Sequence, residues 1–169
     1  RAMDFIRESG EQPWCLHLSY IKPHWPYIVP EPYASMYRPE DALPVVRNEA
    51  DRENPHPVYA AMMNHRVSRT FSKEGVREAV MPGYMGLIKQ IDDQMGVLMQ
   101  FLEQRGLLDT TMIVFTSDHG DYLGDHWMGE KDLFHDASAK IPLIVIDPSP
   151  AAAAAPGTGG EGRGGRSRA

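Results

Sequence analysis

The chain has 169 residues, of which 42% are hydrophobic, and this length and composition predict one domain with a core of ordinary size. Its net charge is −6 and it has no run of like charges, which argues against nucleic-acid binding because phosphate groups need clustered Lys and Arg. The single cysteine excludes an internal disulfide and a Cys-x-x-Cys metal site.

The beginning of the chain predicts a helix followed by a strand. Residues 2–9 have the pattern of an amphipathic helix that Gly10 ends, and the apolar run 13–21 suits a buried strand in which Cys15 is a buried thiol. The first ten residues contain no signal-peptide core, and no apolar stretch approaches the ~20 residues that span a bilayer. We therefore expect no membrane contact, and the compartment, cytoplasm or periplasm, stays open.

The middle of the chain predicts a long surface excursion and then a long helix. Residues 22–57 contain many prolines and little periodicity, and residues 59–75 suit either a helix or more of the same loop. After them, apolar side chains recur at steps of three and four, with Pro82 near the start of this pattern and Gly106 at its end. The stripe predicts a helix and consists of Tyr84, Ile88, Ile91, Met95, Leu98 and Leu102.

Two apolar, β-branched runs follow this helix, at residues 111–117 and 141–147, and both predict strands, the first covered on both faces. Strands that alternate with helices and loops predict an α/β fold with a parallel sheet flanked by helices. This folded unit covers residues 1–149. Residues 150–169 are rich in Ala and Gly and predict a low-complexity disordered tail, and whether that tail is natural or results from a frameshift or truncation stays open.

Asp118 and His119 stand at the carboxyl end of the first of these strands, where parallel sheets place their ligands. A carboxylate beside a neutral imidazole can hold a divalent cation, with Gly120 allowing a sharp turn. A capping Asp with a structural His explains the pair equally well.

Two further residues lie near strand ends. Lys131 follows the Asp-His pair and could provide a positive charge to a bound anion, although a solvated surface Lys is as plausible. His24 lies between prolines after the run 13–21 and could donate a proton to a leaving oxygen, although a structural His is more common. Taken together, the three positions predict metal-assisted attack on an anionic ester.

The segment "TMIVFTSDHGDYLGDH", followed by a Lys and "KIPLIVIDP", resembles the second half of a sulfatase catalytic domain in the alkaline phosphatase superfamily. "MGEKDLFHDASAKIPLIV" and "KPHWPY" are most similar to the phosphonate monoester hydrolase branch, whose members also cleave phosphodiesters and sulfate esters. The resemblance covers about residues 3 to 148. It implies a partial parallel-sheet sandwich flanked by helices that lacks its N-terminal strands, which leaves exposed edges.

The resemblance also implies roles for single residues. Asp118 and His119 become ligands of one divalent metal ion, either Ca²⁺, Mn²⁺, Fe²⁺ or Zn²⁺, while His24 faces the leaving oxygen and Lys131 contacts the transferred anion. The substrate is a small anionic ester. The full-length protein could form a homo-oligomer.

Two parts of the family's site are absent from the 169 residues. The Cys-x-Pro-x-Arg motif that yields the formylglycine nucleophile is missing, and Cys15, followed by "LHLS", cannot replace it. The first pair of acidic ligands is missing as well, so we expect this chain alone to be inactive. Asp125 and His126 are interpreted as loop-packing residues, and His135 has no assigned role.

Two alternatives stay open. Another branch of the superfamily, a phosphohydrolase or mutase with two zinc ions, also uses Asp-His-Gly, but Lys131 and "KPHWPY" argue against it. A non-catalytic remnant that folds without turning over a substrate is the second alternative.

Overall fold

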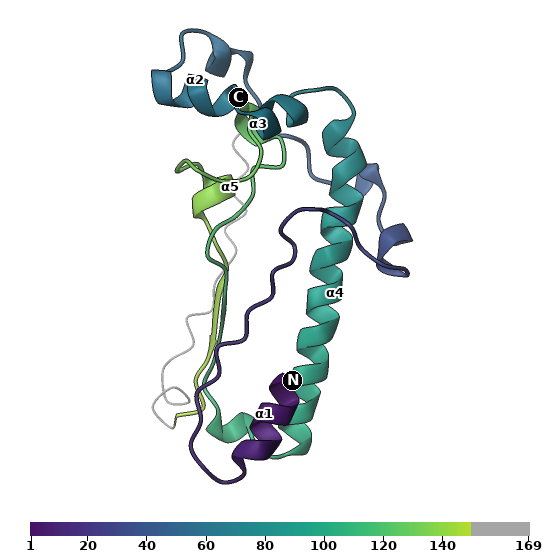
Figure 1. The fold of residues 1–169 in the computed structure, drawn as a ribbon, viewed down its shortest axis with the longest axis vertical. Helices are drawn as coiled ribbons and strands as arrows, with labels where there is room; N and C mark the ends of the chain where they lie inside the picture. Colours follow the sequence, from purple (N-terminus) through teal and green to yellow (C-terminus); the bar gives the residue numbers. More distant parts are fainter. Residues whose placement is uncertain (150–169) are drawn as a thin grey trace, which may run out of the picture.

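The computed structural model of the protein describes residues 1–149, so the predicted tail lies outside the described residues. The described chain is elongated (Figure 1). Helix α4 (Val76–Gln104) runs along one side, and the strands β1 (Ile113–Thr116) and β2 (Leu143–Ile146) run along the other. None of the described helices is long and apolar enough to cross a membrane.

The first predicted helix is confirmed as α1 (Ala2–Ser9), which buries Ile6. It ends where expected because Gly10 has φ 59°, a left-handed conformation that costs a glycine little. The predicted strand 13–21 is wrong: this segment is extended but pairs with no strand among the described residues. Without a covering neighbour Cys15 is exposed, so its predicted burial is wrong as well.

Helix α4 confirms the long predicted helix but begins before the predicted start. It follows Gly75, which has φ 76°, so Pro82 lies inside the helix. A proline inside a helix removes only one intrahelical hydrogen bond, so a helix can continue through it. The prediction took Pro82 as a sign of the helix start and therefore placed that start too late. The predicted stripe is buried only in part: Leu102 is buried, but Ile88 is 46% exposed.

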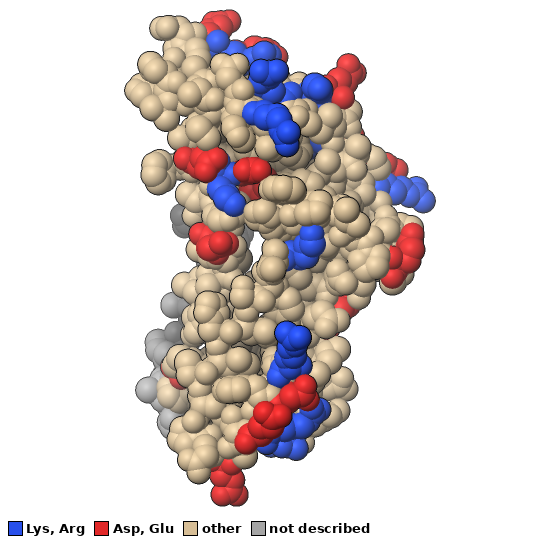
Figure 2. Space-filling model, in the orientation of Figure 1, with Lys and Arg blue, Asp and Glu red and all other residues tan. Residues whose placement is uncertain are grey.

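The other elements are short. Two helices occupy most of the region that could be helix or loop, and irregular chain with isolated 3₁₀ turns fills the predicted excursion. Lys and Arg side chains gather over the end of the molecule that carries α2 and α3 (Figure 2). These elements are η1 (Tyr33–Ser35), η2 (Pro39–Asp41), η3 (Glu49–Arg52), α2 (Pro57–Met63), α3 (Arg66–Phe71), η4 (Leu108–Thr110), η5 (Asp125–Trp127) and α5 (Asp136–Ala139).

The two predicted strands are present, but they pair with each other in antiparallel orientation, with Ile113 opposite Ile146 and Thr116 opposite Leu143. The α/β class is therefore confirmed, and the parallel direction is wrong for this pair. Between the strands the chain forms a loop with only the short η5 and α5, so it returns beside β1 instead of crossing over through a long helix. Val114 is 55% exposed, so the predicted coverage of the first strand on both faces is wrong, and Leu143 of β2 is 69% exposed as well.

The best-buried part of the molecule is the loop after β1, where it packs on α3. Tyr122 and Met128 are each 1% exposed, and Phe71 and Ser68 of α3 are buried against this region. A Cβ on Gly129 would approach Phe71 to 2.6 Å, which shows how closely the loop backbone lies on the helix. The core therefore sits under the loop that carries the predicted site residues.

Candidate active site

Asp118 and His119 follow β1 directly, and the turn after them is set by a close backbone contact. The Gly120 N–H donates to the Ser138 carbonyl oxygen at 2.7 Å. A Cβ on Gly120 would lie 2.0 Å from the Ala137 carbonyl oxygen, so no other residue fits here. The need for glycine therefore comes from the approach of α5 rather than from the sharp turn that the sequence predicted.

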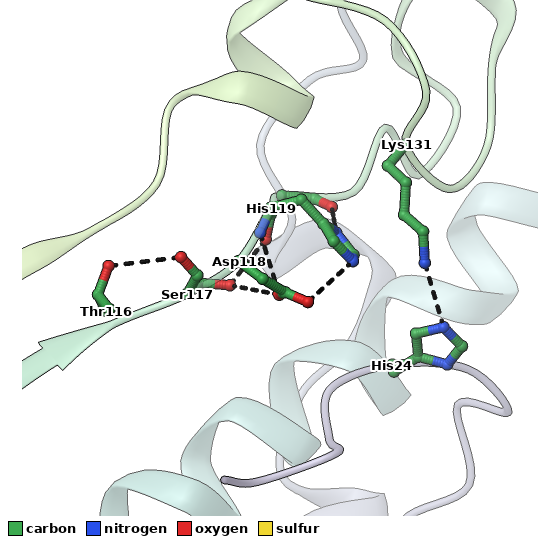
Figure 3. Close-up of polar contacts among 7 residues, drawn as sticks. His24, Thr116, Ser117, Asp118, His119 and Lys131 are labelled. Carbon is green, nitrogen blue, oxygen red and sulfur yellow. Dashed lines mark hydrogen bonds and ion pairs between the residues drawn. The ribbon is translucent and has the colours of Figure 1, made fainter. Parts of the chain in front are cut away.

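The imidazole of His119 is oriented by its own loop. Its Nδ1 lies 2.7 Å from the Gly120 carbonyl oxygen, which can only accept, so Nδ1 carries the proton in the neutral ring. The Nε2 lone pair then faces Asp118 Oδ2 at 3.5 Å (Figure 3). Two facing lone pairs repel each other unless a proton or a cation lies between them, and an oxygen with an imidazole nitrogen is a pair of donors that divalent ions accept.

The Asp118 carboxylate is open to solvent, with 86% of its side chain exposed. Slight burial raises the pKa of this carboxyl, but its own and the His119 backbone N–H, with the nearby imidazole, lower it more, so the pKa lies below its ordinary value. Asp118 is thus ionised at neutral pH. Within residues 1–149 no third His, Cys, Asp or Glu joins the pair in a group that could hold a metal ion.

His24 and Lys131 form a second pair, although they are 107 residues apart in the chain. His24 Nδ1 lies 2.9 Å from the Trp25 carbonyl oxygen and carries the proton, which leaves Nε2 to accept from Lys131 Nζ at 3.4 Å (Figure 3). Lys22 holds the turn below the ring, because its Nζ donates to the His24 and Pro26 carbonyl oxygens. The sequence predicted His24 as a proton donor and Lys131 as a contact of the anion, but it did not predict that these two side chains contact each other.

The structure brings the four predicted site residues together as two pairs. Both pairs lie beyond the carboxyl end of β1 in Figure 3. Within the part of the chain that the structure describes, no hydrogen bond or ion pair joins one pair directly to the other.

Sequence reasoning missed a half-buried carboxylate in the loop after β1. Asp121 accepts from the Tyr27 hydroxyl at 2.8 Å and from the Leu123 N–H at 3.1 Å. Burial raises the pKa of Asp121, and these two donors offset the effect only in part. Burial also raises the pKa of Tyr27, so its hydroxyl remains a donor. The available signal was the second acidic residue of the "SDHGD" motif and the tyrosine that ends "KPHWPY".

The remaining polar residues of the loop pack it in place. Asp125 Oδ1 accepts from the Val46 N–H at 2.9 Å, and the His126 N–H donates to the Val46 carbonyl oxygen at 2.7 Å, as expected for loop-packing residues. The rings of His126 and His135 stack with centroids 4.1 Å apart, and His135 Nδ1 lies 2.9 Å from the Tyr122 hydroxyl. Burial, followed by the charge of His126, lowers the pKa of His135.

Comparison with known proteins places the chain in a family. The family model for sulfatases matches residues 1–158. The chain belongs to the sulfatase family. It is 36% identical over 159 residues to PehA, a multifunctional alkaline phosphatase superfamily protein of Trinickia caryophylli, and 32% identical over 152 residues to an arylsulfatase of Clostridium perfringens. Each alignment covers 87% of this chain but only 31% and 30% of those proteins.

Solved structures give the same result. The phosphonate monoester hydrolase of Agrobacterium radiobacter matches with a TM-score of 0.77 and 37% identity, over 87% of this chain and 32% of that one. The phosphonate monoester hydrolase of Silicibacter pomeroyi matches with a TM-score of 0.75 and 30% identity, over 86% and 32%. The resemblance inferred from the sequence is therefore confirmed, whereas the roles of His24, Asp118, His119 and Lys131 stay predictions.

Proposed function

We propose that this chain supplies part of the active site of a metal-dependent hydrolase of sulfate esters or of phosphonate and phosphate esters. The observation that carries the proposal is the Asp118–His119 pair, whose Oδ2 and Nε2 atoms face each other across 3.5 Å. Membership of the sulfatase family supports the reaction class. In this proposal, a formylglycine nucleophile and further carboxylate ligands come from sequence outside this chain.

The metal ion in this proposal is held by Asp118 Oδ2 and His119 Nε2. An oxygen and an imidazole nitrogen suit Ca²⁺, Mn²⁺, Fe²⁺ or Zn²⁺. When bound, the ion polarises a substrate oxygen and helps to activate the nucleophile. The His119 Nδ1–H bond to the Gly120 carbonyl keeps the ligating nitrogen deprotonated and directed at the carboxylate.

His24 and Lys131 act on the substrate. The Lys131 ammonium offsets negative charge on the transferred sulfuryl or phosphoryl group. Because its Nζ lies 3.4 Å from His24 Nε2, the ammonium, which keeps its protons, and the imidazole would contact the same part of the substrate, and His24 takes up its proton from solvent. His24, protonated at Nε2, then donates that proton to the leaving oxygen.

A second candidate applies to the chain on its own, namely metal binding without turnover. The supporting observation is that residues 1–149 contain no metal-binding group of three or more ligands. The absence of Cys-x-Pro-x-Arg from the 169 residues supports it as well. This candidate predicts that the isolated chain hydrolyses neither aryl sulfates nor phosphonate monoesters.

The experiment begins with the reading frame upstream of Arg1. If it encodes Cys-x-Pro-x-Arg, we expect the complete product to cleave 4-nitrophenyl sulfate or phenyl phosphonates. Its His24→Ala variant should then lose ~10²–10⁴-fold in rate, most strongly with leaving groups of high pKa. Equal losses for good and poor leaving groups would overturn the role of His24, and an upstream stop codon would favour the second candidate.

A further inference from the structure

The half-buried Asp121 carboxylate lies where three site-bearing segments meet. It is two residues after His119, and it accepts a hydrogen bond from Tyr27, which is three residues after His24. The Glu130 N–H also interacts with this carboxylate, and Glu130 is the neighbour of Lys131. One carboxylate thus contacts the segment of each predicted site residue.

The Tyr27 side of this contact is fixed by packing on α4 and α3. The Tyr27 ring makes edge-to-face contacts with Tyr84 and Phe71, with centroids 6.0 and 6.4 Å apart. A Cβ on Gly83 would lie 2.9 Å from the Tyr27 carbonyl oxygen, so the backbone of this segment rests directly on the helix. A hydroxyl held in this way presents a defined position to its acceptor.

Lys131 lies in a strained turn, which a contact with another part of the loop must stabilise. Glu130 has φ 61° and Asp132 has φ 111°, so Lys131 lies between two residues in unfavourable left-handed conformations. The Tyr122 N–H donates to the Glu130 carbonyl oxygen at 2.7 Å, which ties the strained turn to the residue that follows Asp121. Contacts at Asp121 and Tyr122 therefore determine where the Lys131 side chain starts.

We propose that Tyr27 and Asp121 are positioning residues, whose hydrogen bond holds the His24–Lys131 pair at a defined place beside the Asp118–His119 pair. Neither residue touches the reacting groups. This proposal rests on the proposed function, which gives the four residues their roles. The arrangement of the side chains can nevertheless be measured without metal, substrate or turnover. Without this bond the segment that carries His24 and the loop that carries Lys131 move independently.

The chain offers a matched control for this bond. Tyr33 donates its hydroxyl to Asp93 Oδ2 at 2.9 Å, which is the same chemistry on α4 but away from the site. Tyr27→Phe and Tyr33→Phe therefore each remove one phenol-to-carboxylate hydrogen bond and keep the ring. A general loss of stability affects both variants alike.

The experiment measures the nuclear Overhauser effect between the His24 ring protons and the Lys131 Hε protons in the isotopically labelled chain. In Tyr27→Phe we expect the population of the close pair to fall about tenfold, as expected for the loss of a hydrogen bond to a charged group, with the unfolding midpoint equal to that of Tyr33→Phe. Asp121→Ala should lose the signal as well. Asp121→Asn, which keeps an oxygen acceptor for Tyr27, should retain it.

Two results would overturn the positioning role. An unchanged signal in Tyr27→Phe would mean that the hydrogen bond does not hold the pair, and an equal loss in Tyr33→Phe would mean that the effect is general. Failure of the proposed function looks different: the metal ion would not bind at Asp118 and His119, while the signal between His24 and Lys131 would still depend on Tyr27.

Discussion

The loop after β1 and the β1–β2 sheet are joined in sequence but differ in how they are held. The loop has Tyr122 and Met128 at 1% exposure, and its carbonyl and N–H groups bond to α3, α5 and the segment around Val46. The sheet leaves Val114, Leu143 and Ile144 largely exposed. The chain therefore packs the loop after β1 closely but leaves its strands largely uncovered.

This difference indicates that the position of the candidate site residues depends on the close approach of the loop backbone to its neighbours rather than on the sheet. The glycines at 120 and 129 admit the neighbouring backbone and the Phe71 ring, and polar side chains tie the loop ends. The loop should therefore be sensitive to small changes in volume or hydrogen bonding. The sheet should tolerate them.

The largest expected effect comes from filling the space at Gly120. Gly120→Ala places a Cβ 2.0 Å from the Ala137 carbonyl oxygen, and relieving this overlap should cost about 3 kcal/mol of unfolding free energy or more. Urea unfolding measures the loss. Gly96→Ala is the control, because nothing lies within 4 Å of its added methyl group in α4, and it should stabilise the chain by up to about 1 kcal/mol. Equal effects of the two variants would contradict the close approach.

The next effect concerns Arg47, whose guanidinium donates to the carbonyl oxygens of Gly124 and Phe71 at 2.7 Å and lies 4.8 Å from the centre of the Trp127 ring. Arg47→Ala leaves two carbonyl groups without these donors and should cost about 2 kcal/mol. Arg38→Ala, at a largely exposed side chain, should change stability by less than about 0.5 kcal/mol. If Arg47→Ala lost no more unfolding free energy than Arg38→Ala, contacts other than those of Arg47 would hold the loop.

A smaller effect should appear as a pH dependence. Burial lowers the pKa of His135 in the folded chain, so the unfolded chain binds a proton first as the pH falls. The stability is therefore complete above the unfolded pKa of about 6.5 and is lost as the pH falls below it. Urea midpoints between neutral and mildly acidic pH measure this slope, which His135→Gln should reduce and His17→Gln, at an exposed site, should leave unchanged. An unchanged slope in His135→Gln would assign the dependence to other groups.

The smallest effect is expected in the sheet. Leu143 is 69% exposed, so Leu143→Thr should change the unfolding free energy by less than about 0.5 kcal/mol. Denaturation of the monomeric chain measures this difference. A loss above about 1 kcal/mol, the lower end of the effect of burying a side chain, would mean that the β2 face is covered in solution.

The sequence predicted the elements whose signals are local. The helix that ends at Gly10, the long helix, and the runs 111–117 and 141–147 all follow from neighbouring residues, and so does the adjacency of Asp118 and His119. The antiparallel direction of the strands does not follow from neighbouring residues, because it depends on how the loop after β1 folds back. The exposure of Cys15 depends on which neighbours cover it.

The contacts of the candidate site that the sequence did not predict also depend on residues far apart in the chain. Tyr27 and Asp121 are 94 residues apart, and only the packed chain brings the hydroxyl to the carboxylate. The contact between His24 and Lys131 likewise spans 107 residues. Residue types in strand-end motifs therefore identified candidate chemistry, whereas the partners that hold it required the structure.

The most direct test of the account is Mn²⁺ binding to this chain, followed by electron paramagnetic resonance. The account predicts one bound ion whose binding is lost in Asp118→Asn and in His119→Ala but kept in Asp109→Asn, a change at an exposed residue outside the site. Absence of binding at millimolar Mn²⁺, or binding that survives both site variants, would contradict the claim that Asp118 and His119 form part of a metal site.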